Sequence, residues 1–304
     1  MMKILRTPDE CFENLPDYDY EPHYTTIKDD DGTEIRIHYL DEGPLDAEPI
    51  LLMHGNPSWS YLYRKMIPGL LATGRRVIAV DLVGCGRSDK PAKKKYYTLA
   101  RHVDWIEKWL LAVDLKNITL FCQDWGGTIG LNVLVENQER FDRVIMANTG
   151  IPIGDGGNRW LYWWLKLMKW APSFPWSMAF RKTFRSSEDL TEAEFDAYRK
   201  APFPERKYQA GILQFPQLIS VFPNNPGVLQ NRAAWEKLKK FEKPVLTLFG
   251  DRDPVTRGSH IRYIKHVAGA AGQNHKLIKG GGHFIQEEKP EELLAEVIPF
   301  LEVS

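Results

Sequence analysis

The stretch LFCQDWGGTIG, residues 120–130, decides the fold of this chain. It opens on an apolar run that reads as a buried strand, and it ends in a glycine-bounded turn that leads into a predicted helix. At the turn, Asp124 is followed directly by the large indole of Trp125. Turn chemistry accounts for an aspartate and for glycines, but it has no use for the tryptophan. The pair therefore indicates a functional site where a strand gives way to a helix.

The segments around this stretch alternate between apolar runs and helical patterns. Continuous apolar runs are typical of strands buried on both faces of a parallel sheet, and apolar residues three and four apart predict helices. A hairpin comes first, with YTTIKD and EIRIHYL on either side of the turn DDDG. Further strands are predicted at 49–55, 76–81, 117–122, 143–148, 243–250 and 275–280, and helices at 59–71, 98–115, 127–137, 259–267 and 291–301. This order predicts an α/β fold with a mostly parallel eight-stranded sheet flanked by helices.

The strand pattern is interrupted between about residues 150 and 232, where tryptophan, proline and charged residues dominate. We therefore expect a core domain at 1–151 and 232–304, with a helical cap domain at 152–231 inserted after the sixth strand. Aromatic side chains of this density suit core packing, and they suit the lining of an apolar ligand cavity equally well. The tryptophans of this insertion are Trp160, Trp163, Trp164, Trp170 and Trp176.

The composition excludes several classes of protein. Lys plus Arg equals Asp plus Glu, at 40 each, so no net field attracts nucleic acid or an anionic membrane. The three cysteines have no CxxC spacing, which argues against a disulfide framework and against a zinc site. The first residues carry no apolar signal core, and no apolar run reaches the ~18 residues of a membrane span. We expect a cytoplasmic protein.

Reactive residues stand in four loops that follow predicted strands: HGNPSW (54–59), CQDWGG (122–127), FGDRDP (249–254) and GGGHF (280–284). In α/β sheets, ligands bind outside the carboxyl ends of the strands. A strand, a sharp turn and a helix around a nucleophile are typical of the α/β-hydrolase elbow. Asp124 stands where those enzymes usually carry serine. The predicted nucleophile is therefore a carboxylate, which attacks carbon by displacement and leaves an ester.

His283 follows the last predicted strand and is the predicted general base for hydrolysis of that ester. Such a histidine needs a carboxylate that holds its tautomer and stabilises its cation. Asp253 fits this role because it directly precedes Pro254, where the loop turns away from its strand, and Asp251 is a close rival. The order nucleophile, acid, histidine is that of the α/β-hydrolases.

Each of these residues also has a structural interpretation. Asp124 at a strand-to-helix turn could cap the helix, His283 could be a plain loop residue, and Asp253 a turn former. The three together, each at a strand end and in hydrolase order, favour chemistry. His54 is interpreted as structural, because a His-Gly pair before proline is a frequent element after such a strand.

These motifs resemble the haloalkane dehalogenases of the α/β-hydrolase superfamily, and the likeness covers nearly the whole chain. It rests on LRTPDECFENLPDY, HGNPSWSYLYRKMIP, DLVGCGRSDKP, NITLFCQDWGG, APFPERKYQAG and GGHFIQEE. The subfamily that this chain resembles most keeps its catalytic acid after the seventh strand, which supports Asp253 as the acid. The resemblance implies Asp124 as nucleophile, His283 as base, a helical cap over an apolar cavity, and no metal or organic cofactor.

The resemblance also implies that the indole N–H of Trp125 donates to the leaving halide, and that the backbone N–H groups of Asn56 and Trp125 form the oxyanion hole. One position departs from the most similar relatives, which usually carry glutamate where this chain has Asn56. An amide can donate to a halide and a carboxylate cannot, so Asn56 and Trp125 are the predicted halide pair. Trp164 is the second choice for the halide donor that acts with Trp125, and Trp163 is an equal rival for that role. Packing alone would also explain both tryptophans.

The expected activity is conversion of a small haloalkane and water to a primary alcohol and halide, by a monomer or weak dimer. An epoxide hydrolase is the alternative, because it shares the Asp nucleophile and the His base. It would need tyrosines that protonate an epoxide, and Tyr162, Tyr198 and Tyr208 are available. Gln123 and Asn56 argue against that alternative. A ligand-binding protein without turnover is the third hypothesis, which the presence of all three reactive residues disfavours.

Overall fold

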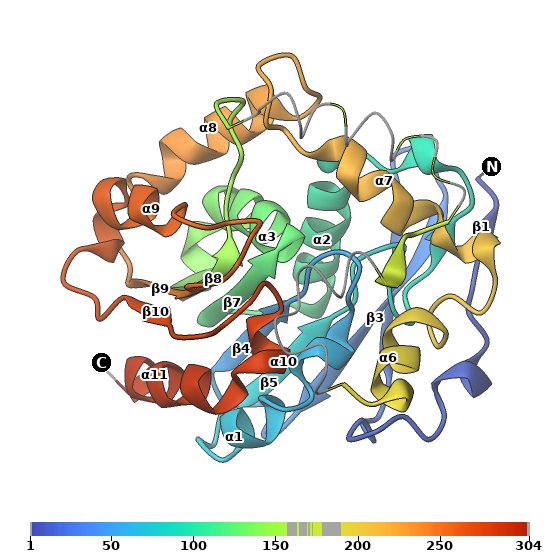
Figure 1. The fold of residues 1–304 in the computed structure, drawn as a ribbon, viewed down its shortest axis with the longest axis horizontal. Helices are drawn as coiled ribbons and strands as arrows, with labels where there is room; N and C mark the ends of the chain where they lie inside the picture. The colour runs from blue at the N-terminus through green and yellow to red at the C-terminus, as the bar shows by residue number, and fades with distance from the viewer. Residues whose placement is uncertain are drawn as a thin grey trace.

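The computed structural model describes residues 2–156, 163, 169, 171, 173–177 and 190–302. Its centre is an eight-stranded sheet in the order β10-β9-β8-β7-β4-β5-β3-β2 (Figure 1). β2 and β3 run antiparallel to each other, as do β3 and β5, and the other neighbours are parallel. The strands are β2 (His23–Lys28), β3 (Glu34–Glu42), β4 (Pro49–Met53), β5 (Arg76–Val80), β7 (Ile118–Asp124), β8 (Phe141–Thr149), β9 (Val245–Gly250) and β10 (Lys276–Ile278). The predicted mostly parallel sheet and its N-terminal hairpin are confirmed.

Burial explains why the central strands have continuous apolar sequences. Every residue of β4 and of β9 is buried, because helices cover both faces of the sheet. The edge strand β2 is different: only Ile27 is buried, and its other residues are partly or fully exposed. A second, two-stranded sheet joins the N-terminus to the loop after β5. It consists of β1 (Ile4–Leu5) and β6 (Lys90–Pro91), and neither strand was predicted from the sequence.

The helices form two layers around the sheet (Figure 1). On one side, α3 (Trp125–Glu136) packs against both α2 (Leu99–Val113) and α8 (Val228–Leu238). α1 (Ile67–Leu71) contacts α11 (Pro290–Glu302) on the other side. The remaining helices are α6 (Glu192–Arg199), α7 (Ala210–Leu218), α9 (His260–His266) and α10 (Ile285–Glu288), with short 3-10 turns at Asp9–Phe12, Ser60–Tyr63, Lys94–Tyr96, Gln138–Arg140, Arg206–Gln209 and Ala268–Ala270.

One predicted helix is wrong in its extent. The segment 59–71 is a 3-10 turn at Ser60–Tyr63 followed by the short α1, instead of one continuous helix. Pro68 has no N–H, so a helical hydrogen bond to the carbonyl of Arg64 cannot form. The whole 3-10 turn is also buried, so it has no solvent face of the kind an amphipathic helix needs.

The segment between β8 and β9 contains helices and, among its described residues, no strand. α6 begins with a capping box, in which Thr191 accepts from the N–H of Glu194 and Glu194 accepts from the N–H of Thr191. This helical insertion after the sixth strand of the large sheet was predicted from the loss of strand pattern. In the described part of the chain, no helix combines the length and the apolar character that a membrane span requires.

Candidate active site

Asp124 is the last residue of β7, and α3 begins at the next residue, two positions earlier than predicted. Its backbone has φ 50° and ψ −123°, a conformation that non-glycine residues rarely adopt. The neighbouring glycines make this turn possible, because a Cβ on Gly126 would overlap the carbonyl of Met53 and one on Gly127 would overlap Thr149. The Asp124 side chain makes no capping hydrogen bond, so the helix-cap interpretation of this residue is wrong.

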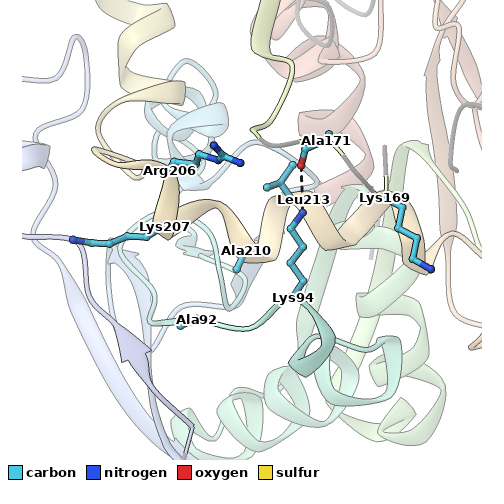
Figure 2. A pocket seen from close by; sticks show the side chains of 8 residues that line it. All are labelled: Ala92, Lys94, Lys169, Ala171, Arg206, Lys207, Ala210 and Leu213. Atoms are coloured by element: carbon cyan, nitrogen blue, oxygen red, sulfur yellow. Dashed lines mark hydrogen bonds between the residues drawn. The ribbon is translucent and has the colours of Figure 1, made fainter. Parts of the chain in front are cut away.

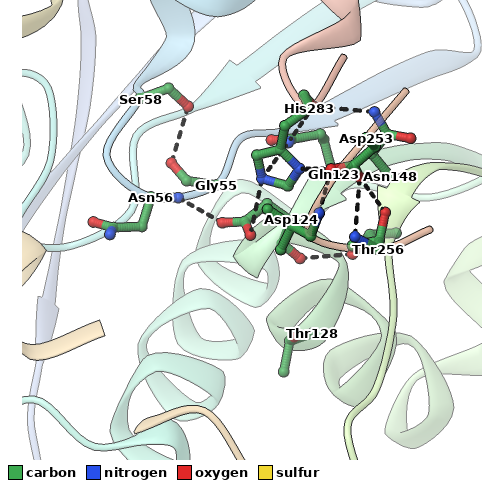
Figure 3. A network of polar contacts seen from close by, with 12 residues as sticks. Gly55, Asn56, Ser58, Gln123, Asp124, Thr128, Asn148, Asp253, Thr256 and His283 are labelled. Atoms are coloured by element: carbon green, nitrogen blue, oxygen red, sulfur yellow. Dashed lines mark hydrogen bonds and ion pairs between the residues drawn. The ribbon is translucent and has the colours of Figure 1, made fainter. Parts of the chain in front are cut away.

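The structure brings the three predicted reactive side chains together, although they stand up to 159 positions apart in the chain (Figure 3). His283 Nε2 lies 3.4 Å from Asp124 Oδ2. On the other side of the ring, Nδ1 lies 3.1 Å from Asp253 Oδ1 and 3.2 Å from Oδ2. Asp253 and His283 are buried, and Asp124 is partly accessible. This is the arrangement of a nucleophile, a base and an orienting acid.

Asp251, the rival for the acid position, lies elsewhere. It is exposed, and its Oδ1 accepts the backbone N–H of Gly280 at 2.7 Å. Asp253 instead accepts from the backbone N–H of Val255 at 2.8 Å and from the hydroxyl of Thr256. These contacts hold the Asp253 carboxylate against His283, so the geometry favours Asp253.

Two carboxylates set the charge of His283. Burial works against the imidazolium, but Asp253 and Asp124 overcome it and raise the pKa of His283 to about 10. Burial likewise opposes the charge of Asp253, and the His283 cation outweighs it, so the pKa of Asp253 is lowered. At neutral pH the resting site therefore holds a histidine cation between two anions.

Asn148 supports this site and was not identified from the sequence. Its amide donates to the carbonyls of Gly282, at 2.7 Å, and His283, at 3.1 Å, and its Oδ1 accepts the N–H of Gly250 at 2.8 Å. Gln123 donates to the His283 carbonyl as well, at 3.0 Å. The two amides hold the His283 loop in place (Figure 3). The sequence signal was their position at the ends of neighbouring strands, where the loops converge.

Asn56 and Trp125 lie beside the Asp124 carboxylate. The backbone N–H of Asn56 donates to Asp124 Oδ1 at 2.8 Å (Figure 3), which is the geometry of one oxyanion-hole donor. The Oδ1 of the Asn56 amide is buried without a partner. Trp125 is only 6% exposed, its ring centroid lies 5.0 Å from that of Phe215, and among the described residues its indole N–H has no acceptor. The indole N–H of Trp125 is thus available as a donor, whereas the Asn56 side chain points away from the Asp124 carboxylate (Figure 3).

The other predicted candidates have different surroundings. His54 is buried with both ring nitrogens engaged, by the carbonyl of Gly55 and by the N–H of Leu82, which confirms its structural interpretation. Trp164 and Tyr162 lie outside the described residues. Trp163 is 62% exposed, which does not suit a ligand of a buried halide. The hydroxyl of Tyr198 is engaged by Glu287 at 2.6 Å.

A cavity of about 330 Å³ begins at Asp124 and Trp125. Its described lining is mixed, with apolar residues and hydroxyl groups from the loop after β8, from α9 and from the end of α7. A second cavity, of about 600 Å³, borders none of the catalytic candidates (Figure 2). Its basic side chains point in different directions and do not converge on one place. Lys207 pairs with Glu205, and Lys94 donates to the carbonyl of Ala171. Asp124 and Trp125 line the first cavity, so the candidate active site borders this cavity.

Comparison with known proteins identifies the class of this fold and then its family. Residues 48–290 match the sequence profile described as alpha/beta hydrolase fold. The chain is 49% identical to a haloalkane dehalogenase of Psychrobacter cryohalolentis, over 99% of this chain and 98% of that one. It is 44% identical to a haloalkane dehalogenase of Mycobacterium marinum, over 98% and 99%. The tetrameric haloalkane dehalogenase DpaA of Paraglaciecola agarilytica has a similar solved structure, with TM-score 0.86 and 32% identity over 99% of this chain and 100% of that chain.

The chain is thus an α/β-hydrolase in fold. Within that class it belongs to the haloalkane dehalogenase family, since relatives of that name match it over nearly the whole length of both chains. The family resemblance inferred from the motifs is confirmed.

Proposed function

We propose that this enzyme converts haloalkanes to a primary alcohol and halide through a covalent ester on Asp124. The contact chain from Asp124 through His283 to Asp253, placed at a strand-to-helix elbow, carries this proposal. Membership of the haloalkane dehalogenase family supports it. Of the tyrosines that the epoxide hydrolase alternative requires, Tyr198 is already hydrogen-bonded to Glu287, so among the described residues Tyr208 is left for that role.

In the first step, Asp124 Oδ2 attacks the carbon that bears the halogen. The new carbon–oxygen bond forms as the carbon–halogen bond breaks, and the bonding pair leaves with the halide. The indole N–H of Trp125 and the amide N–H₂ of Asn56 are the proposed donors to that halide. Trp164 remains the runner-up donor. The indole N–H of Trp125, which has no acceptor among the described residues, and the backbone contact that places Asn56 next to Asp124 support the pair.

In the second step, water attacks the carbonyl carbon of the Asp124 ester and His283 takes its proton. The tetrahedral intermediate then collapses, the bond from this carbon to the alkoxide breaks, and the alkoxide takes the proton from His283 and leaves as the primary alcohol. The Asp124 carboxyl group is restored, and its proton passes to His283. Ester formation removes the anionic charge of Asp124, one of the two charges that raise the pKa of His283. The pKa of His283 then falls, so a neutral imidazole becomes available as the base. The backbone N–H groups of Asn56 and Trp125 are the proposed oxyanion hole, since Asn56 already donates to Asp124 Oδ1. Asp253 stabilises the resulting histidine cation.

We further propose that residues 152–231 act as a cap over the site of a core formed by 1–151 and 232–304. Cavity-lining residues from both parts support this division, because Asp124 and Thr256 share the cavity with Ile219 and Val221. We also propose a cytoplasmic monomer or weak dimer. Light scattering would decide between this state and the tetramer described for the Paraglaciecola relative.

The test is halide release from 1-bromobutane. We expect Asp124→Ala to abolish release, because no other carboxylate contacts His283 Nε2 among the described residues. His283→Phe should form the ester and fail to hydrolyse it, so the peptide that contains Asp124 should gain the mass of a butyl group.

The matched control is Asp251→Asn, which changes an exposed carboxylate near the triad that does not contact His283. This variant should keep wild-type turnover. Full turnover by Asp124→Ala would overturn the mechanism. Turnover of styrene oxide in preference to 1-bromobutane would instead establish the epoxide hydrolase.

A further inference from the structure

The cavity that begins at Asp124 and Trp125 ends at an ion pair on the surface. It lies between the loop after β8 and α9, and its lining includes both buried and exposed residues. Trp125 at the inner end is 6% exposed, whereas the side chains of Arg262 and Asp155 are 27% and 60% exposed. The two residues therefore mark the outer end of the cavity.

Two contacts hold Arg262 at this end. Its Nη1 lies 3.2 Å from Asp155 Oδ2, and its guanidinium lies over the Trp235 ring at 4.2 Å from the centroid. The next residue, Tyr263, is buried and accepts the backbone N–H of Ile151 at 2.6 Å, which joins α9 to the loop. The backbone around the pair is thus anchored. The Asp155 side chain is the more exposed partner, at 60% against 27% for Arg262.

The charges along the cavity matter because the proposed reaction makes an anion inside it. Among the described lining residues, Arg262 is the only cation, while Asp124 and Asp155 are anions. Hydrolysis of the ester restores the Asp124 carboxylate, so the halide then shares the site with a like charge. A halide that moves outward along this lining is stabilised by a cation on its route.

We propose that Arg262 is the anion contact on the route by which halide leaves, and that Asp155 competes with the halide for it. The inference rests on the proposed function. Opening of the pair exposes the guanidinium to the halide, and closing returns Arg262 to Asp155 as the halide enters bulk water. The pair thereby sets how strongly product halide is retained.

The experiment measures bromide binding by the resting enzyme, through quenching of tryptophan fluorescence, with the association rate from stopped flow. At an ionic strength of about 0.01 M, where charges act over ~30 Å, Asp155→Asn should raise the association rate about threefold. Arg262→Gln leaves Asp155 unpaired at the mouth and should lower that rate by about the same factor. Arg262→Lys keeps the charge and should resemble the wild type. At about 0.5 M ionic strength the differences should disappear.

Asp114→Asn is the matched control, because Asp114 pairs with Arg140 at 2.9 Å and is 58% exposed, but it does not line the cavity. Opposite shifts in the two cavity variants, with an unchanged control, support the inference, since loss of a purely structural contact would not reverse sign. Equal rates in all variants, shifts of one sign, or no saturable bromide binding by the wild type would overturn it. Intact bromide binding without turnover of 1-bromobutane would overturn only the proposed function.

Discussion

At the scale of single residues, His283 couples the active site to the stability of the fold. Burial opposes its charge, yet Asp253 and Asp124 raise its pKa to about 10 in the folded protein. In an unfolded chain a histidine titrates near pH ~6.5. Between these two pH values the folded protein holds a proton that the unfolded chain has released. The stabilisation is therefore complete below pH ~6.5 and is lost as the pH rises through about 10.

This linkage predicts how the melting temperature depends on pH. Between pH 6 and pH 10, the wild type should lose more thermal stability than His283→Phe, which has no proton to release at this position. Asp124→Asn should lie between them, because it keeps Asp253 and removes one of the two anions. Melting curves followed by circular dichroism test this order. Parallel pH dependence in all three proteins would contradict the assignment of the charge to His283.

At the scale of elements, a buried charge cluster joins the insertion to the core. Arg64 is fully buried and pairs with Glu194, on α6, at 2.7 Å and with Glu287, on α10, at 2.8 Å. Tyr198 donates to Glu287 at 2.6 Å, and Lys65 pairs with it at 2.6 Å. α10 begins two residues after His283, so the same cluster anchors α6 of the insertion and the helix that follows the catalytic loop.

Removal of Arg64 should therefore be costly. Arg64→Met leaves Glu194 and Glu287 without their shared guanidinium and should lower the free energy of unfolding by about 3–5 kcal/mol. Arg199→Met is the control, since Arg199 pairs with Glu192 and Asp196 on the surface of α6, and its loss should cost only about 0–1 kcal/mol. Urea unfolding measures both values. Equal losses of unfolding free energy in the two variants would show that the buried cluster stabilises the fold no more than the surface pairs of Arg199.

At the scale of the whole molecule, the charges balance. The 40 basic and 40 acidic residues give a formal net charge of zero at pH 7 and an isoelectric point of about 7.1. Proteins near zero net charge repel one another least.

The solubility of this protein at low salt should therefore pass through a minimum near pH 7 and rise on both sides. Precipitation assays between pH 5 and pH 9 test this prediction. Solubility that changes in one direction across that range would show that the net charge differs from the formal count.

The linear sequence determined the parts of this protein that depend on local pattern. Apolar runs that alternate with helical periods specified the parallel sheet, and that sheet brings its carboxyl-end loops to one edge. Asp124 and His283 could be predicted as candidates because each follows a strand in hydrolase order, and the same pattern narrowed the acid to Asp251 or Asp253. The prediction of one continuous helix over 59–71 was wrong, because burial and Pro68 decide the conformation of this segment and local periodicity does not.

Only the tertiary structure decided the contacts that cross large distances in the chain. Asp253 prevails over Asp251 because its side chain turns toward His283, a choice that two residues so close in sequence do not reveal. Asn148 supports the His283 loop across 135 positions, and Arg262 meets Asp155 across 107. Such pairs follow from how strands and helices are packed beside one another, and no local propensity encodes that placement.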